Sequence, residues 1–327
     1  GWGRAIGCVI GCEWWGFSRG SEKVAKGSRR CGGSGWEACV VYTARAQRSD
    51  ARMMPFLHLG PLTIPTYGLM VAAGLLIAAY ILQADFRRRK LEVDAFLVIG
   101  IAGLAGIVGS RIYEVLETPR EFVAAPWGQL FSRFGFTWFG ALIGGFVALI
   151  FLARRAKIPL LTFLDACSPA ASVGYAVGRM GCLLSGDGDY GVPTSLPWGM
   201  SFPNGLVPTT ARVHPTPIYE FLAWVTIGAF LWRMGGKAAR GPKAAGEIFS
   251  AYLILTGVAR FLVEFIRINP RVLWGLTNAQ AVSIVSVLAG MVLLRRSKSR
   301  FHKIKKEHRI LEHIEAKGDV MQPEYHK

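Results

Sequence analysis

The sequence has few charged residues and no cysteine pattern that would organise a small secreted or zinc-binding fold. Only 18% of its 327 residues are charged, whereas soluble domains carry about 25%. Its six cysteines match no zinc spacing and indicate no disulfide framework. Acidic residues are also scarce, with 21 against 38 lysines and arginines, so the formal net charge is +17. The low share of charged residues argues against a soluble globular domain.

Apolar residues make up 52% of the chain, and they are gathered in long blocks. Runs such as YGLMVAAGLLIAAYILQA (67–84) and AFLVIGIAGLAGIVGS (95–110) approach the roughly 20 residues that a helix needs to cross a bilayer. We therefore predict an all-α, polytopic membrane protein with about seven transmembrane helices. The expected spans are 63–84, 95–114, 136–153, 161–184, 217–234, 246–267 and 277–294.

The basic residues lie in short clusters between these blocks, and every odd-numbered span ends in one. The even-numbered spans are followed by loops of mixed charge. Because basic loops remain in the cytoplasm, we predict an N-terminus outside and a cytoplasmic C-terminus. Basic residues distributed in this way form no single patch, so we expect no nucleic-acid binding. The four clusters are Arg87, Arg88, Arg89 and Lys90; Arg154, Arg155 and Lys157; Arg233, Lys237, Arg240 and Lys243; and Arg295, Arg296, Lys298 and Arg300.

Three regions are expected along the chain. Residues 1–53 lack periodicity and are rich in Gly, Arg, Ser and Trp, so we interpret them as a disordered or upstream extension, with the biological start at Met53 or Met54. A metal-binding tail using Cys8 and Cys12 is the less favoured alternative. Residues 54–298 form the membrane domain. Residues 299–327 are a basic cytoplasmic tail, which either forms a helix along anionic headgroups or stays disordered.

Several charged residues lie inside the predicted spans, where a charge costs a few kcal/mol and needs a partner or a role. Arg179 lies near the outer end of the fourth span. Arg260, Glu264 and Arg267 lie in the sixth, at a spacing that places them on one helix face. One interpretation is a self-neutralising ladder that holds two helices together. The other is an anion site, in which Arg179 and Arg260 grip phosphate oxygens from two helices.

Other polar residues are expected at the same depth. The segment SGDGDYGVPTSLPWGMSFP (185–203) is rich in turn-forming residues and predicts a structured outer loop that contains Asp187. VHPTPIYE (213–220) follows and places His214 and Glu220 at the start of the fifth span. Tyr67 opens the first span, where a tyrosine also fits an interfacial aromatic belt.

The order of the motifs resembles the bacterial prolipoprotein diacylglyceryl transferase family. The matching segments extend over nearly all of residues 58–292 and follow the family's order. They are GPLTIPTYGLM (60–70), GSRIYEVLE (109–117), GFTWFGALIGG (135–145), GRMGCLLSGDGDYG (178–191), PWGMSFP (197–203), HPTPIYE (214–220), GEIFSAYLILTGVARFLVEFIR (246–267) and LTNAQAVSIVSVLAG (276–290).

The resemblance implies a reaction, partners and a location. The family transfers the diacylglyceryl group of phosphatidylglycerol to the thiol of the lipobox cysteine in a prolipoprotein signal peptide. A thioether forms and glycerol phosphate leaves, with no cofactor and no metal. The implied location is the bacterial plasma (inner) membrane, with the active site towards the periplasmic side.

The resemblance also implies roles for individual residues. Fixed cations would stabilise the negative charge that develops on the leaving phosphate. Catalytic roles are expected for Tyr67, Arg179, His214 and Arg260, and substrate-binding roles for Arg179, Asp187, Gly191, Glu220, Glu264 and Arg267.

Two positions depart from the family's pattern. Phe139 stands where the family often has a histidine, and Cys182 where it often has an asparagine. The proton acceptor for the thiol therefore stays open among His214, Asp187 and Tyr67, in that order. The departures leave one alternative function, a divergent paralogue that binds phospholipid without transferring it to prolipoproteins, or that uses another acceptor. A small-anion transporter is less favoured, because the second, third and seventh spans offer few polar residues.

Overall fold

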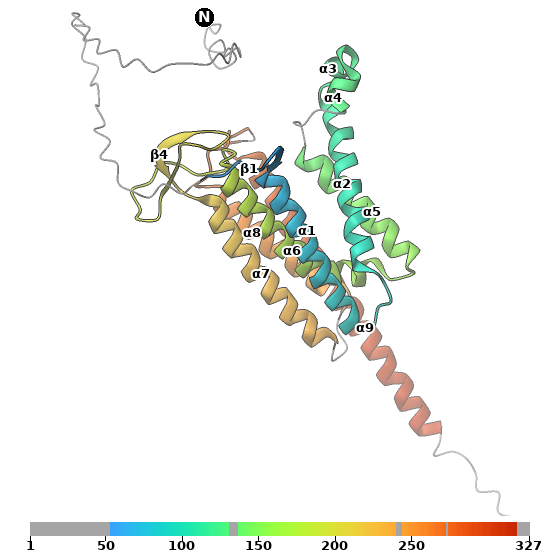
Figure 1. Cartoon of the computed structure of the whole chain (residues 1–327). Helices are drawn as coiled ribbons and strands as arrows, with labels where there is room; N and C mark the ends of the chain where they lie inside the picture. The colour runs from blue at the N-terminus through green and yellow to red at the C-terminus, as the bar shows by residue number, and fades with distance from the viewer. Residues whose placement is uncertain (1–52, 131–136, 240–243, 273, 319–327) are drawn as a thin grey trace, which may run out of the picture. The chain divides into compact units, whose positions relative to one another are not determined.

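The computed structural model describes residues 53–130, 137–239, 244–272 and 274–318 (Figure 1). A long helix lies over each of the seven predicted spans, and five of the described helices are long and apolar enough to cross a membrane: α1, α2, α5, α6 and, over Asn278–Lys303, α9. The protein is therefore a largely helical, multi-pass membrane protein, and the total of seven spans stays a prediction. The seven helices are α1 (Thr66–Arg88), α2 (Ala95–Glu117), α5 (Trp138–Arg155), α6 (Leu160–Ser185), α7 (Thr216–Ala239), α8 (Glu247–Val263) and α9 (Asn278–Gly318).

The expectation of an all-α chain needs a correction, because two small antiparallel hairpins accompany the helices. Strands β1 (Phe56–Leu59) and β2 (Leu62–Pro65) pair directly before α1. Strands β3 (Met200–Phe202) and β4 (Thr209–Val213) lie in the predicted outer loop. Two short helices, α3 (Pro119–Ala124) and α4 (Pro126–Leu130), follow α2. All of these elements lie between or before the long helices.

The sixth predicted span is shorter than expected. Helix α8 ends at Val263, with Glu264 as its C-cap, so Arg267 lies beyond the helix. The predicted stack on one helix face is therefore wrong for Arg267. The physical reason is a competing backbone pairing: the amide of Val192 donates to the carbonyl of Ile266 at 2.8 Å, and Gly191 pairs with Arg267 as an isolated antiparallel bridge.

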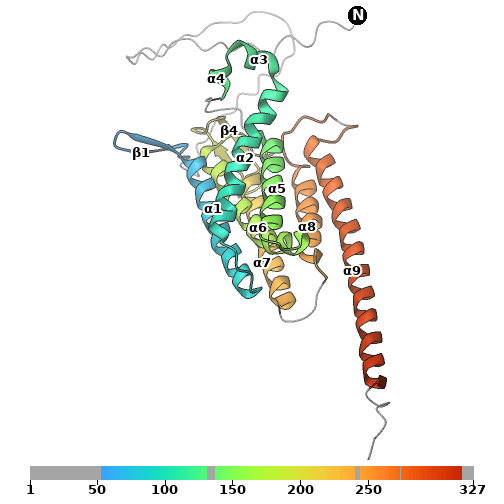
Figure 2. The same ribbon diagram turned by 90° about the vertical axis from the view of Figure 1, so that its right-hand side faces the viewer.

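Helix α6 packs against α1, α7 and α8, while α2 pairs with α5 and α8 with α9 (Figures 1 and 2). Small residues allow these close approaches, as is usual for helices in lipid. A Cβ on Gly74 of α1 would lie 2.7 Å from the carbonyl oxygen of Gly174 on α6, and one on Gly144 of α5 would lie 2.2 Å from that of Ala105 on α2. The glycines in the apolar blocks thus set the distances between neighbouring helices.

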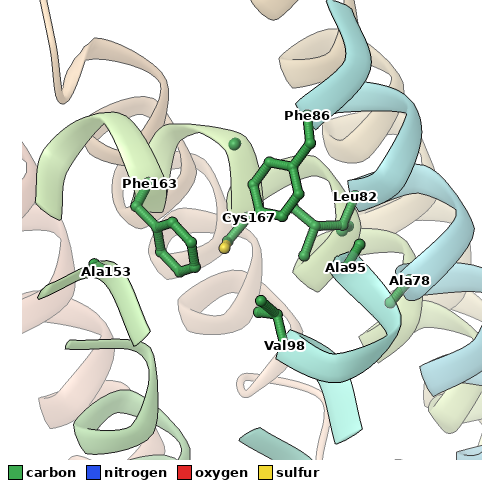
Figure 3. Packing of buried hydrophobic residues seen from close by; sticks show 10 residues of the cluster. Ala78, Leu82, Phe86, Ala95, Val98, Ala153, Phe163 and Cys167 are labelled. Carbon is green, nitrogen blue, oxygen red and sulfur yellow. The ribbon is translucent and has the colours of Figure 1, made fainter. Parts of the chain in front are cut away.

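A buried apolar cluster joins the last turns of α1 to the first turns of α6 and α2 (Figure 3). Leu82 and Phe86 of α1 are fully buried there, and the rings of Phe86 and Phe163 lie 5.7 Å apart. Because α1 and α6 are antiparallel, this contact places the opposite end of α1 against the end of α6. Gly181 accordingly lies against Tyr67, with a Cβ at that glycine only 3.3 Å from the tyrosine ring.

The structure describes no residue before Met53 and none after Gly318. The predicted extension lies outside the described residues as far as 52, and so do residues 319–327. Helix α9 continues without interruption to Gly318. Residues 299–318 are therefore helical and continue α9, while the predicted position of this helix along anionic headgroups stays a prediction.

Candidate active site

A single buried glutamate organises the charged residues at the end of the helices. Glu220 lies in the second turn of α7, directly after the proline-rich segment that starts this helix, and its side chain is fully buried. Its carboxylate accepts a hydrogen bond from the hydroxyl of Tyr175 at 2.8 Å. One oxygen lies 2.6 Å from Nε of Arg179, and the other 3.0 Å from Nη1 of Arg260 and 3.3 Å from Nη1 of Arg267. Glu220 therefore gathers three guanidinium groups from different parts of the chain.

Two further carboxylates complete this group. Asp189, in the loop after α6, accepts from Arg179 at 2.5 Å and also pairs with Arg267. Glu264 lies 2.9 Å from Nη2 of Arg260. We name this set the arginine–carboxylate cluster; it consists of Arg179, Arg260, Arg267, Asp189, Glu220 and Glu264. Three positive and three negative side chains give it a formal charge of 3 − 3 = 0. Because each charge has an opposite partner, the cluster can remain ionised in a low-dielectric environment.

The ion pairs fit the interpretation of a self-neutralising ladder, whereas the anion site stays a prediction. Arg260 and Glu264 form the predicted i, i+4 pair, and Arg179 and Arg260 converge from α6 and α8 on one carboxylate. The arginines are not bare cations, however, because each already has a carboxylate partner. Some guanidinium N–H donors are not used by these pairs. Nη2 of Arg179 is buried without a hydrogen-bond partner among the described residues. The side chain of Arg260 is 23% exposed, against 7% for Arg267.

The loop after α6 brings two aspartates to the cluster with different environments. The carboxylate of Asp187 accepts from the backbone amide of Asp189 at 3.2 Å, so it caps the turn. Burial raises the pKa of Asp187, and the neighbouring charge of Asp189 raises it further. Burial would also raise the pKa of Asp189, but the charges of Arg179 and Arg267 prevail and lower it to about 2. Asp189 is thus a fixed anion, whereas Asp187 is the more basic carboxylate.

Cys182, Asp187 and Asp189 offer three possible metal-ligand atoms within 4.8 Å of one another. Nη1 of Arg179 donates to Asp189 and also lies 3.3 Å from the sulfur of Cys182. A guanidinium in this position already neutralises the aspartate and would repel a metal cation. The donor set therefore does not fit a metal ion.

The other predicted site residues lie at the same end of the molecule but touch the cluster less directly. Tyr67 is half exposed and packs on Gly181, two residues after Arg179. His214 follows β4, and its Nδ1 lies 3.2 Å from the hydroxyl of Tyr219. Its backbone carbonyl accepts from Gly191 at 2.9 Å. The histidine ring is thus held by Tyr219, and among the described residues it forms no hydrogen bond or ion pair with the cluster.

Gly191 is the point where three segments meet. Its amide bonds to His214, and it forms a bridge with Arg267. A Cβ at this position would lie 2.5 Å from the carbonyl oxygen of Ile266 and 2.9 Å from Cβ of His214. Only glycine allows the outer loop to approach the end of α8 this closely, and that approach brings Arg267 to Asp189.

Tyr175 is a member of the site that the sequence did not indicate. It precedes Arg179 by four residues, so both lie on one face of α6, and it bonds directly to Glu220. That spacing was the available signal, but a tyrosine in an apolar helix is ordinary. Asp189 lies in the predicted outer loop but was not among the predicted site residues, although it pairs with two of the three arginines.

A family model described as prolipoprotein diacylglyceryl transferase matches residues 55–296. The chain belongs to this family. It is similar to proteins named phosphatidylglycerol–prolipoprotein diacylglyceryl transferase from three bacteria. The Clostridium tetani protein is 31% identical over 252 residues, which are 76% of this chain and 99% of the relative. The Synechococcus elongatus protein is 31% identical over 72% and 84% of the two chains, and the Geobacter sulfurreducens protein 34% identical over 65% and 81%.

Membership of the prolipoprotein diacylglyceryl transferase family makes this protein a transferase of lipoprotein biosynthesis. Among the described residues, only one of the two departures, Cys182, contacts the cluster directly. Phe139 stacks loosely on Tyr113, with ring centroids 6.4 Å apart, while its neighbour Trp138 contacts the ring of Tyr175 edge-on. Cys182 is buried beside Arg179. Neither substitution disturbs the pairing of the three arginines with Glu220.

Proposed function

We propose that this protein transfers the diacylglyceryl group of phosphatidylglycerol to the lipobox cysteine of prolipoproteins. The observation that carries the proposal is the convergence of Arg179 and Arg260 from separate helices on Glu220. Relatives that share most of the chain are named for this reaction. The alternative, phospholipid binding without transfer, rests on Phe139 and Cys182; both departures leave the three arginines paired with Glu220.

The proposed reaction changes the charge of the lipid phosphate. The cysteine sulfur forms a bond to the glycerol carbon as the bond from that carbon to the phosphate oxygen breaks. The electron pair of the broken bond goes to the phosphate, and the thiol proton goes to a base. The phosphate therefore gains one negative charge as glycerol phosphate leaves, and fixed donors aimed at it would lower the barrier.

The donors that would meet this charge are the unpaired edge of Arg179 and the exposed part of Arg260. Nη2 of Arg179 is an unused donor, and Arg260 is the most exposed of the three arginines. Arg267 is nearly buried, and its nitrogens face Asp189, Glu220 and Glu264. We assign it a positioning role. Because carboxylates hold the guanidiniums before substrate arrives, little reorganisation is needed during the reaction.

Asp187 is the proton acceptor that the geometry favours. Its carboxylate lies within 4.8 Å of that of Asp189, which in turn bonds Arg179, and its pKa is raised by burial and by Asp189. A base works best when its pKa approaches the working pH. His214 is instead held by the hydroxyl of Tyr219. Tyr67, packed on Gly181, is suited to positioning the lipid.

The site is assigned to the periplasmic side of the inner membrane. The cluster lies where α6 and α8 end, while the basic residues that follow α1 and α5 lie at the opposite end of the helices. Basic loops remain cytoplasmic, so the cluster faces outward.

The test is transfer from phosphatidylglycerol to a synthetic lipobox peptide, read by the mass of the peptide. Arg179→Ala and Arg260→Ala should each abolish the mass increase while the protein still inserts into the membrane. Arg155→Ala, at the exposed end of α5, is the matched control and should retain activity. Full activity in either cluster variant would refute the phosphate-binding role. A wild-type protein that binds the lipid but never modifies the peptide would favour the alternative function.

A further inference from the structure

A second charged region lies at the other end of the helices, around a cavity of about 440 Å³. The cavity lies where α1 ends and where α6 and α8 begin. Arg88, Arg89 and Lys90 line it together with Thr162 and the start of α8. From Thr162 to Arg179 is 17 residues of one helix, or about 25 Å at 1.5 Å per residue. The hydrocarbon core of a bilayer is about 30 Å thick, so the two charged regions are separated by nearly its full thickness.

Two of the carboxylates near this cavity, those of Asp85 and Asp165, are already occupied. Asp85 is fully buried, pairs with Nε of Arg88 and lies 3.2 Å from Nε of Arg89. Asp165 accepts from the backbone amides of Gly246 and Phe249, each at 2.7 Å, and so caps the start of α8. These two carboxylates thus have structural tasks of their own. Glu247, at the start of α8, also lines the cavity, but among the described residues it forms no ion pair with Arg88 or Arg89.

Several arginine donors here have no partner. Nη2 of Arg88 and Nη2 of Arg89 are buried and bond to no atom of the residues that the structure describes. Both approach Gly235 of α7, where an added Cβ would lie 2.1 Å from one and 3.3 Å from the other. Arg88 is fixed in place, because its Nη1 donates to the carbonyl of Trp232 at 2.8 Å and its guanidinium lies 3.9 Å from the ring. An unsatisfied buried donor on a charged group costs more than about 1–3 kcal/mol.

We propose that this cavity, which we name the inner anion site, binds a phosphate group. Arg88, Arg89 and Lys90 all line the cavity, and two guanidiniums and an ammonium match the oxygens of a phosphate. A basic cluster that only fixes orientation would be solvated, whereas here the side chain of Arg89 is only 11% exposed. The phosphate belongs either to an anionic phospholipid of the facing leaflet or to a soluble phosphate ester. The site is distinct from the arginine–carboxylate cluster and binds its ligand without reaction.

The test uses the full-length protein in phosphatidylcholine nanodiscs, without phosphatidylglycerol. In one arm, dioleoyl phosphatidic acid is added to the discs. In the other, inorganic phosphate is titrated against chloride at matched ionic strength. A rise in the thermal unfolding midpoint reports binding, and its dependence on probe concentration gives an affinity. A response to the lipid alone identifies a headgroup site, and a response to inorganic phosphate identifies a site for a soluble ester.

Matched lysine variants test whether the probe binds at this cavity. Lys90 and Lys157 both follow a helix and both have φ of 56°, but only Lys90 lines the cavity. Asparagine tolerates this conformation, so Lys90→Asn and Lys157→Asn remove the same charge at equal strain. We expect Lys90→Asn to weaken the affinity by about 5-fold and Arg89→Gln by about 10-fold or more, with Lys157→Asn unchanged. No response to either probe, or equal losses in the two lysine variants, would overturn the proposal.

Discussion

Glu220→Gln is the most informative perturbation of the arginine–carboxylate cluster. The glutamine keeps the shape of the side chain and removes its charge. The cluster then has three arginines against two carboxylates, a formal charge of 3 − 2 = +1, in a place where Glu220 is fully buried. Losing one partner of a buried ion pair costs about 3–5 kcal/mol. If about 3 kcal/mol of this appears in the transition state, kcat/KM falls roughly 100-fold.

The structure also predicts whether the fall in kcat/KM comes from kcat or from KM. Arg179 keeps Asp189 and Arg260 keeps Glu264, so the guanidiniums stay nearby but lose their common anchor. We therefore expect mainly a fall in kcat, because misaligned donors stabilise the departing phosphate less well. The assay is single-turnover transfer to a lipobox peptide, followed by mass, on protein whose thermal unfolding is measured in parallel.

Glu117→Gln provides the control, since Glu117 is exposed at the end of α2 and carries the same chemical change. It should remain within about 2-fold of the wild type. The reasoning is refuted if Glu220→Gln, correctly folded, transfers lipid as fast as Glu117→Gln. In that case the three arginines would be aligned by something other than their shared carboxylate.

Two further predictions concern the loop after α6. Because burial and Asp189 raise the pKa of Asp187, its carboxylate is available as a base only above that raised pKa; transfer should therefore rise with pH across this range in a pH–rate profile. Asp187→Asn should remove this dependence and lower kcat at least about 100-fold, and a profile that keeps its acidic limb would exclude Asp187 in favour of His214. Gly191→Ala forces a Cβ to 2.5 Å from the carbonyl oxygen of Ile266, so we expect a loss of about 1–3 kcal/mol in unfolding free energy. Gly100→Ala, with nothing within 4 Å of its Cβ, should show no such loss in the same denaturation experiment.

Helix positions were accessible from the sequence because they depend on local properties. Apolar runs and the charges that end them predicted α2, α5 and α6 to within a few residues. The errors arose where non-local pairing competes with the helix. The first predicted span began inside β2, which pairs with β1. The sixth ran past Val263, because the sequence does not reveal that the backbone around Arg267 pairs with Gly191.

The sequence predicted most of the residues of the candidate site but not which of them pair with one another. Arg179, Arg260, Glu220 and Glu264 were singled out because ionised side chains in apolar segments need partners. The partners of Glu220 could not be assigned, since it is 41 residues from Arg179 and 40 from Arg260 along the chain. Tyr175 was missed for the same reason, as its function depends on a contact with another helix.

The sequence by itself determined that this chain forms apolar helices punctuated by basic clusters, and that a few charges are held among them. These features follow from hydrophobicity and charge counted along the chain. Only the tertiary structure decided that one glutamate holds three arginines, and that Arg88 and Arg89 keep unsatisfied donors beside a cavity at the opposite end. Such pairings depend on which helices lie side by side, and that depends on small residues and buried rings far apart in the sequence.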